Sequence, residues 1–263
     1  MVDPEPNHSH QGKDRSPMLA EHGFDTGDVA LNYAEGPDAG PPLVLIHGGG
    51  SHWQGFLPVI PALALQWHVY ALDLRGHGRS DWTPPHYRLD DYVADLLAFL
   101  DRQVARPAVL MGHSLGGMIA LLAASRVPHV VRAVILGDTP LTLSEMRARI
   151  GATAAEADQH NACSDHPRDP TAGGTALARD FDAVFAPWQP AAVLPTITCP
   201  VLFFHADPAH GSAVSDDARA QALQLLPDAE HVWVQGAGHG LWDERPTQVL
   251  AALAAFLAAL PPG

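Results

Sequence analysis

The chain has 263 residues and a formal net charge of −14, from 29 acidic and 15 basic residues. This length suits one globular domain that needs neither disulfides nor metal, and two cysteines cannot build a disulfide framework. Because the basic residues are scattered and no stretch is long and apolar enough to span a membrane, we expect a cytoplasmic protein without nucleic-acid or membrane partners.

Residues 1–20 are rich in proline, histidine and charge, and are predicted to form a disordered tail. Apolar runs typical of strands then alternate with helical patterns. The predicted strands are Val29–Tyr33, the run LVLIHGGG from Leu43, His68–Leu74, Ala108–Ser114, Val131–Asp138, Cys199–Asp207 and His231–Gly236. The predicted helices are Leu89–Gln103, Leu115–Ser125, Ala218–Leu226 and Pro246–Leu260. This order predicts a parallel sheet with helices on both faces and ligands at the carboxyl ends of its strands.

The strand signal disappears between Thr139 and Ile197, where helix-like stretches flank a polar segment rich in proline and glycine. We expect residues 139–197 to form a helical lid over the strand ends, inserted after the sixth strand. Residues 21–138 and 198–263 then form the core.

The run GHSLG at residues 112–116 has the pattern G-x-S-x-G between a predicted strand and a predicted helix. A serine on so sharp a turn is held out at the sheet edge, and the flanking glycines remove side chains that would collide there. Ser114 is therefore the candidate nucleophile. The following helix points its N-terminus at the same place, which makes the N–H of Leu115 a candidate oxyanion donor.

Two other glycine-rich turns follow predicted strands. The run HGGG at residues 47–50 allows a backbone N–H to approach a substrate closely, and Gly49 is the second candidate oxyanion donor. His47 is expected to fix this loop by hydrogen bonding. The run GAGHGLW places His239 after the last strand, where a neutral imidazole can take the proton of Ser114 and later return it to the leaving group.

The motifs HGGG, DLRGHGRS, GHSLGG and GAGHGLW occur in this order in the α/β-hydrolase family, which the chain resembles from about Val29 to Leu260. The resemblance implies a Ser-acid-His triad, a mostly parallel eight-stranded sheet and a cap after the sixth strand. It also implies that DLRGHGRS is a structural turn near the site. Haloalkane dehalogenases and epoxide hydrolases of the family use Asp where this chain has Ser114, so we expect neither activity.

The triad acid departs from the family's commonest pattern. The resemblance implies an Asp a few residues beyond the strand VLFFHA, and Ala209 occupies that position. Two carboxylates remain as candidates: Asp138, where some branches of the family carry the acid, and Asp207. We favour Asp138, because Asp207 in HADP also suits the capping of a turn.

Five aromatic residues are candidates for lining an apolar pocket, although aromatics at helical spacing, as at Phe181 and Phe185, more often pack between lid and body. They are Trp53, Phe181, Phe185, Trp188 and Trp242.

The favoured function is hydrolysis of small esters or lactones through an acyl-Ser114 intermediate, with a small-molecule substrate and neither cofactor nor metal. A carbon-carbon bond hydrolase of ring-cleavage products would use the same triad and stays as an alternative. A low-turnover ligand-binding protein on the same scaffold is a third hypothesis, motivated by Ala209. A homodimer is compatible with each of them.

Overall fold

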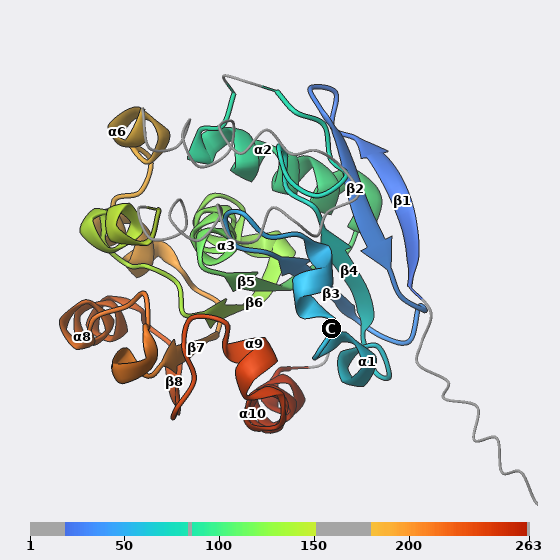
Figure 1. The fold of residues 1–263 in the computed structure, drawn as a ribbon. Helices are drawn as coiled ribbons and strands as arrows, with labels where there is room; N and C mark the ends of the chain where they lie inside the picture. The colour runs from blue at the N-terminus through green and yellow to red at the C-terminus, as the bar shows by residue number, and fades with distance from the viewer. Residues whose placement is uncertain (1–18, 84–85, 151–179, 262–263) are drawn as a thin grey trace, which may run out of the picture.

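The computed structural model describes residues 19–83, 86–150 and 180–261. In these residues an eight-stranded sheet forms the centre of the molecule, in the order β1-β2-β4-β3-β5-β6-β7-β8 (Figure 1). Its strands are β1 (Ala20–Asp25), β2 (Ala30–Glu35), β3 (Pro42–Ile46), β4 (His68–Leu72), β5 (Ala108–His113), β6 (Val131–Gly137), β7 (Val201–Ala206) and β8 (Ala229–Val234). The pairs β1–β2 and β2–β4 are antiparallel and the others are parallel. The predicted mostly parallel sheet is confirmed.

Helices cover both faces of this sheet, as predicted (Figure 1). One face carries α2 (Leu89–Phe99), α3 (Leu115–Arg126) and α8 (Asp216–Leu225), and the other carries α1 (Ile60–Leu63), α9 (Leu241–Glu244) and α10 (Pro246–Ala259). Strands β3, β4 and β7 are buried along their whole length, because apolar helix faces pack on both sides of them. This explains their continuous apolar runs.

The edge strand β1 was not predicted from the sequence. The predicted sheet begins at Val29, and the predicted disordered tail covers residues 1–20. Ala20 already pairs with Glu35, and β1 pairs with β2 along all its residues. Only Phe24 of this strand is buried, so it lacks the apolar run by which the other strands are found. The remaining residues of the predicted tail lie outside the described residues.

Between β6 and β7, the described residues form short helices joined by turns and irregular stretches, and no strand. Residues 143–150 are helical, and they are followed by α6 (Phe181–Val184), α7 (Pro190–Val193) and the 3-10 turn η4 (Leu194–Thr196). The insertion thus follows the sixth strand, as predicted. Residues 151–179 lie outside the described residues, and the role of the segment as a lid stays a prediction.

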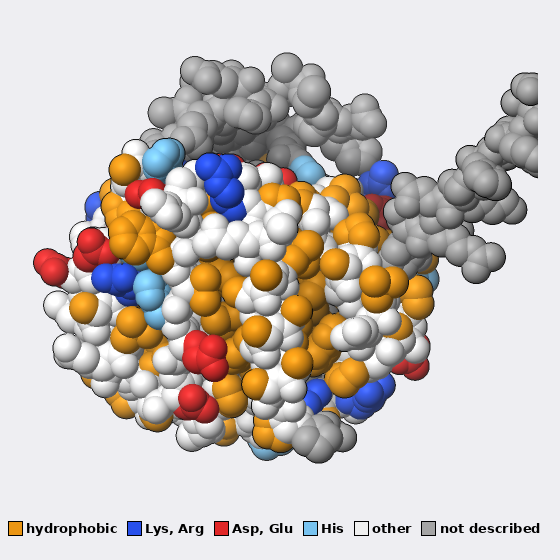
Figure 2. All heavy atoms as spheres, turned by 90° about the horizontal axis from the view of Figure 1, so that it is seen from below, with side chains coloured by type: hydrophobic (Ala, Val, Ile, Leu, Met, Phe, Trp, Pro, Cys, Tyr) orange, Lys and Arg blue, Asp and Glu red, His pale blue; other side chains and the backbone are white. Residues whose placement is uncertain are grey.

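The outer face of α1 and α10 is mainly apolar. No charged residue occurs in α10, and its outward side borders a groove of about 470 Å³. The lining residues are Ala62, Leu63, Gln66, Trp67, Leu250, Ala251, Ala254, Leu257 and Ala258. Figure 2 shows the molecule from below, with hydrophobic side chains gathered over the middle of this face. Among the described residues, no helix has the length and apolar character to cross a membrane.

Candidate active site

Ser114 lies on a strained turn between β5 and α3. Its φ of 51° and ψ of −117° put a non-glycine residue in a conformation that L-residues rarely adopt. Its N–H donates to the carbonyl oxygen of Gly137 at 3.0 Å, which ties the turn to the end of β6. The backbone strain is therefore supported by the neighbouring strand, and the side chain is held at the carboxyl edge of the sheet.

The glycines on both sides of Ser114 are required by close backbone contacts. A Cβ on Gly112 would overlap the carbonyl oxygen of Gly116, and a Cβ on Gly116 would overlap that of Ile46. The G-x-S-x-G pattern thus reflects the packing of the first turn of α3 against β3 and β5, as the sequence analysis expects.

The structure brings His239 and Asp138 together. The Nδ1 atom of His239 donates to Oδ2 of Asp138 at 2.7 Å, although 101 positions separate them in the chain. The Asp138 side chain is completely buried, and that of His239 is 12% exposed. His239 follows β8 and Asp138 follows β6, so both lie at the sheet edge where Ser114 follows β5.

The carboxylate of Asp138 has three further hydrogen-bond donors, all from the region around the end of β7. The Ala206 N–H donates at 3.2 Å, the Ser212 hydroxyl at 2.6 Å and the Ala213 N–H at 2.7 Å. Burial alone would raise the pKa of Asp138, but the hydrogen bonds from His239, Ala213 and Ser212 outweigh it and hold this pKa below its usual value. Asp138 is therefore ionised near neutral pH. Nothing in the sequence distinguishes Ser212 from other loop serines.

Asp207, the other candidate acid, lies in a different environment. Its carboxylate accepts from the N–H groups of Ala209 and Gly236, each at 3.0 Å. Hydrogen bonds from these two backbone groups lower the pKa of Asp207. It therefore caps the turn η5 (Pro208–His210), as the sequence suggests, and braces the loop before His239. Ala209 is exposed.

The glycine turn at residues 48–49 packs against the candidate nucleophile. A Cβ placed on Gly48 would lie 3.1 Å from the Cβ of Ser114, and one on Gly49 would lie 3.8 Å from a methyl group of Leu115. Leu115 is the first residue of α3, where backbone N–H groups have no acceptor within the helix. The two candidate oxyanion donors, Gly49 and Leu115, thus come from segments that meet beside Ser114.

Two histidines hold this glycine turn in place. His47 donates from Nδ1 to the carbonyl oxygen of Gly48 at 2.7 Å and accepts from the Leu74 N–H at Nε2 at 3.0 Å. His77 accepts from the Gly50 N–H at 3.1 Å. Burial lowers the pKa of His47 well below its usual value, so it stays neutral. The prediction that His47 fixes the loop agrees with these contacts.

The five aromatic candidates for a pocket lining all pack in the two hydrophobic cores, and each is at most 9% exposed. The indole of Trp53 donates to Glu21, and that of Trp188 donates to the carbonyl oxygen of Leu141. Trp242 packs against Phe56, on the side of α1 and α10. These five residues therefore pack in the protein interior and do not line an apolar pocket, which is the alternative left open by the sequence.

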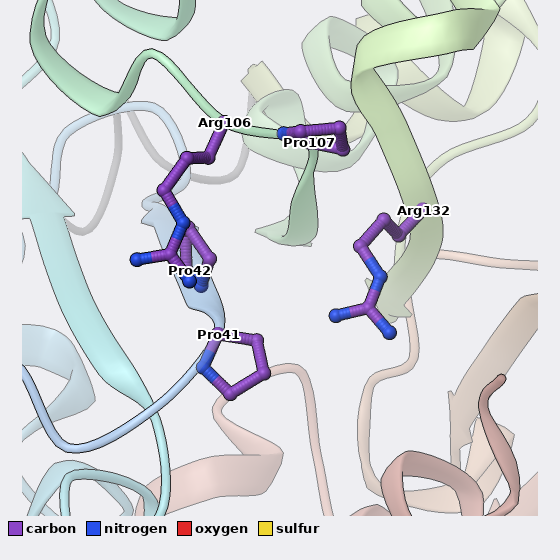
Figure 3. A pocket seen from close by; sticks show the side chains of 5 residues that line it. All are labelled: Pro41, Pro42, Arg106, Pro107 and Arg132. Carbon is purple, nitrogen blue, oxygen red and sulfur yellow. The ribbon is translucent and has the colours of Figure 1, made fainter. Parts of the chain in front are cut away.

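A pocket of about 250 Å³ lies at the opposite edge of the sheet (Figure 3). Its lining residues are Pro41, Pro42, Arg106, Pro107 and Arg132. They stand at the amino ends of β3, β5 and β6, whereas Ser114 and Asp138 follow the carboxyl ends of β5 and β6. The pocket is therefore separate from the candidate active site. Within the described ranges, no group of three or more His, Cys, Asp or Glu residues is arranged to hold a metal ion.

Comparison with known proteins agrees with this fold. The family model of the alpha/beta hydrolase fold matches residues 41–154. The 2-(acetamidomethylene)succinate hydrolase of Mesorhizobium japonicum is 31% identical over 265 residues, which cover 89% of this chain and 93% of the relative. A pimeloyl-[acyl-carrier protein] methyl ester esterase of Xylella fastidiosa is 39% identical over 108 residues, 41% of this chain and 40% of that protein.

Solved structures share the whole architecture. The crystal structure of E-2-(acetamidomethylene)succinate hydrolase matches with a TM-score of 0.76 and 28% identity, covering 92% of this chain and 100% of that one. These relatives are hydrolases, and the similarity to the Mesorhizobium enzyme covers 89% of this chain and so extends through both halves of the core. The chain belongs to the α/β-hydrolase family.

Proposed function

We propose that the protein is a serine hydrolase that cleaves small carboxylic esters or lactones through an acyl-Ser114 intermediate. The observation that carries this proposal is the 2.7 Å hydrogen bond from His239 to the buried carboxylate of Asp138, at the sheet edge that presents Ser114. A nucleophile, a base and a group that orients the base are the three parts that acyl transfer by serine requires.

In the first step, the hydroxyl oxygen of Ser114 attacks the carbonyl carbon while Nε2 of His239 takes its proton. Because Nδ1 of His239 donates to Asp138, Nε2 is the nitrogen with a free lone pair in the neutral ring. The carboxylate keeps this tautomer and stabilises the imidazolium that forms. The N–H groups of Gly49 and Leu115 stabilise the negative oxygen of the tetrahedral intermediate.

The intermediate then collapses, and the imidazolium of His239 protonates the leaving alcohol. A water molecule attacks the acyl group on Ser114 with His239 again as base, which releases the acid and restores the free enzyme. These steps need no group beyond the residues named and water.

A second candidate substrate is 2-(acetamidomethylene)succinate, the compound in the name of the Mesorhizobium relative. This relative matches 89% of the chain, whereas the methyl ester esterase matches 41% of it. A carbon-carbon bond hydrolase would use the same three residues, and only its substrate distinguishes it from an ester hydrolase.

The test is steady-state hydrolysis of p-nitrophenyl acetate and butyrate by the wild type and by Ser114→Ala. We expect turnover by the wild type and its loss in the variant. Turnover that persists in Ser114→Ala would refute the proposal. Cleavage of the acetamido compound or of a vinylogous 1,5-diketone, without cleavage of either ester, would move the assignment to the amide or to the carbon-carbon bond hydrolase.

A further inference from the structure

His113 makes a contact that the catalytic steps above do not use. It is the last residue of β5 and directly precedes Ser114. Its Nε2 atom lies 2.7 Å from the backbone carbonyl oxygen of His239, and the centroids of the two rings are 4.5 Å apart. Because a carbonyl oxygen only accepts, Nε2 of His113 carries the hydrogen.

The His113 ring is held from several sides. Its Nδ1 atom faces Gly48, where an added Cβ would come within 2.9 Å of it. The indole of Trp242 meets the ring edge to face, with centroids 6.0 Å apart. The donor at Nε2 therefore has a defined direction, toward the loop that carries His239.

His113 also keeps its tautomer over the pH range in which such enzymes work. Burial and the positive charge of a protonated His239 lower the pKa of His113 to about 3. Near neutral pH it is an uncharged donor and does not compete for the proton of Ser114. Of the two imidazoles, which are tilted by 46° to each other, only that of His239 donates to Asp138.

The loop that leads to His239 is braced by two carboxylates. Asp207 accepts from the Gly236 N–H at 3.0 Å, and Glu244 accepts from the Gly238 N–H at 2.7 Å. At His239 itself, Asp138 accepts from the side chain and His113 donates to the backbone. The ring and the backbone of the candidate base are thus fixed by different partners.

We propose that His113 is a positioning residue, which uses its hydrogen bond to the His239 carbonyl oxygen to hold that imidazole between Asp138 and Ser114. The inference rests on the proposed function. One peptide bond links His113 to Ser114, so this contact joins the nucleophile's turn directly to the base's loop. An error of about 1 Å in such a geometry costs roughly a hundredfold in rate.

Two substitutions distinguish the effect of the hydrogen-bond donor of His113 from the effect of its side-chain volume. His113→Gln keeps an N–H donor at about the distance of Nε2, and His113→Met has similar length but no donor. His113→Asn, whose amide is too short to reach the carbonyl oxygen, serves as a second variant without this bond if His113→Met does not fold. His129→Met, on the exposed turn Pro128–Val130, is the matched control at a surface site.

The first readout is the low-field proton resonance of His239 Nδ1–H, assigned by its loss in His239→Gln. It reports the bond to Asp138 without any substrate. We expect His113→Met and His113→Asn to shift or broaden it, and His113→Gln and His129→Met to preserve it. An unchanged resonance in folded His113→Met and His113→Asn would overturn the proposal, whether or not the protein hydrolyses esters.

The second readout is the split between kcat and KM on p-nitrophenyl acetate. We expect His113→Met to lower kcat at least tenfold (about 1.4 kcal/mol) with KM within about twofold, and His113→Gln to stay within about threefold of the wild type. Equal losses in His113→Gln and His113→Met would overturn positioning by the donor. Turnover that persists in Ser114→Ala would refute the proposed function instead, and the resonance would still decide the role of His113.

Discussion

Replacing Asp138 by asparagine tests the acid of the proposed triad. Asparagine tolerates the left-handed backbone of this position, where φ is 41°, so the substitution removes the charge with little change of shape. Oδ1 of Asp138 accepts from Ala206 and Ser212, while Oδ2 accepts from Ala213 and His239. The amide NH₂ is best accommodated toward Ser212, whose hydroxyl can rotate to accept. The amide oxygen then still faces His239.

The expected loss follows from the missing negative charge. A unit charge about 4 Å from the imidazolium, at an effective dielectric constant of about 20, is worth about 4 kcal/mol. Since about 1.4 kcal/mol corresponds to a tenfold change in rate, we expect kcat/KM to fall by about 10² to 10³. An amide turned the other way would favour the wrong tautomer of His239 and cost about 10⁴.

The assay is kcat/KM on p-nitrophenyl acetate near neutral pH, with circular dichroism to establish that each variant is folded. Asp207→Asn is the matched control, because the Asp207 carboxylate contacts the turn η5 and the loop before His239 but not the His239 side chain, and the substitution should cost less than tenfold. The assignment of Asp138 as the acid is refuted if Asp138→Asn keeps more than about a tenth of the wild-type kcat/KM. It is also refuted if Asp207→Asn loses more of kcat/KM than Asp138→Asn does.

Three further predictions concern stability. Gly116→Ala should lower the melting temperature by about 5–10 °C, since overpacking against the Ile46 carbonyl costs up to about 3 kcal/mol. The control Gly23→Ala, which has open space around the added methyl group, should change the melting temperature by less than about 2 °C. Equal shifts in the two variants would contradict the packing argument. Burial lowers the pKa of His113 to about 3 and that of His231 to about 4, whereas both take up protons near pH 6.5 when unfolded. The stability that depends on these neutral rings is complete above about pH 6.5 and is lost as the pH falls toward 4. The urea-derived free energy of unfolding should therefore be lower at pH 5 than at pH 7, by about 2 kcal/mol for His113 alone. A free energy of unfolding that does not change with pH would contradict the lowered pKa values of the two rings. Trp188→Phe removes the indole donor to the buried carbonyl of Leu141 and should reduce the free energy of unfolding by about 1–2 kcal/mol at an unchanged denaturant slope, and an unchanged midpoint would refute this.

Much of the fold is determined locally in the sequence. Strands covered on both faces must be apolar throughout, and this pattern is visible in any short window, as in β3 and β7. The turn at Ser114 is equally local, because the clashes that demand Gly112 and Gly116 involve the strand before it, the helix after it and one adjacent strand. The predicted alternation of strands and helices agrees with the structure for these reasons.

Elements stabilised by partners distant in the chain escaped the sequence analysis. Strand β1 has one buried side chain, and its backbone pairing with β2 makes it a strand. Trp53 and Trp242 follow glycine-rich turns near the site, but contacts with Glu21 and with Phe56 turn them into the core. Side-chain direction at such positions depends on which elements are neighbours, and no local pattern records that.

The choice between Asp138 and Asp207 shows the same division most clearly. The sequence alone determined that a serine turn, a histidine loop and two carboxylates follow the ends of strands, and hence that all lie at one edge of a parallel sheet. Because β6 and β7 are adjacent, both carboxylates arrive at that edge. Only the tertiary structure decided that Asp138 meets His239, since backbone N–H groups of Ala209 and Gly236 engage Asp207, and Ser212 and Ala213 complete the shell of Asp138. These contacts join segments up to 101 positions apart, and their geometry exists only in the folded chain.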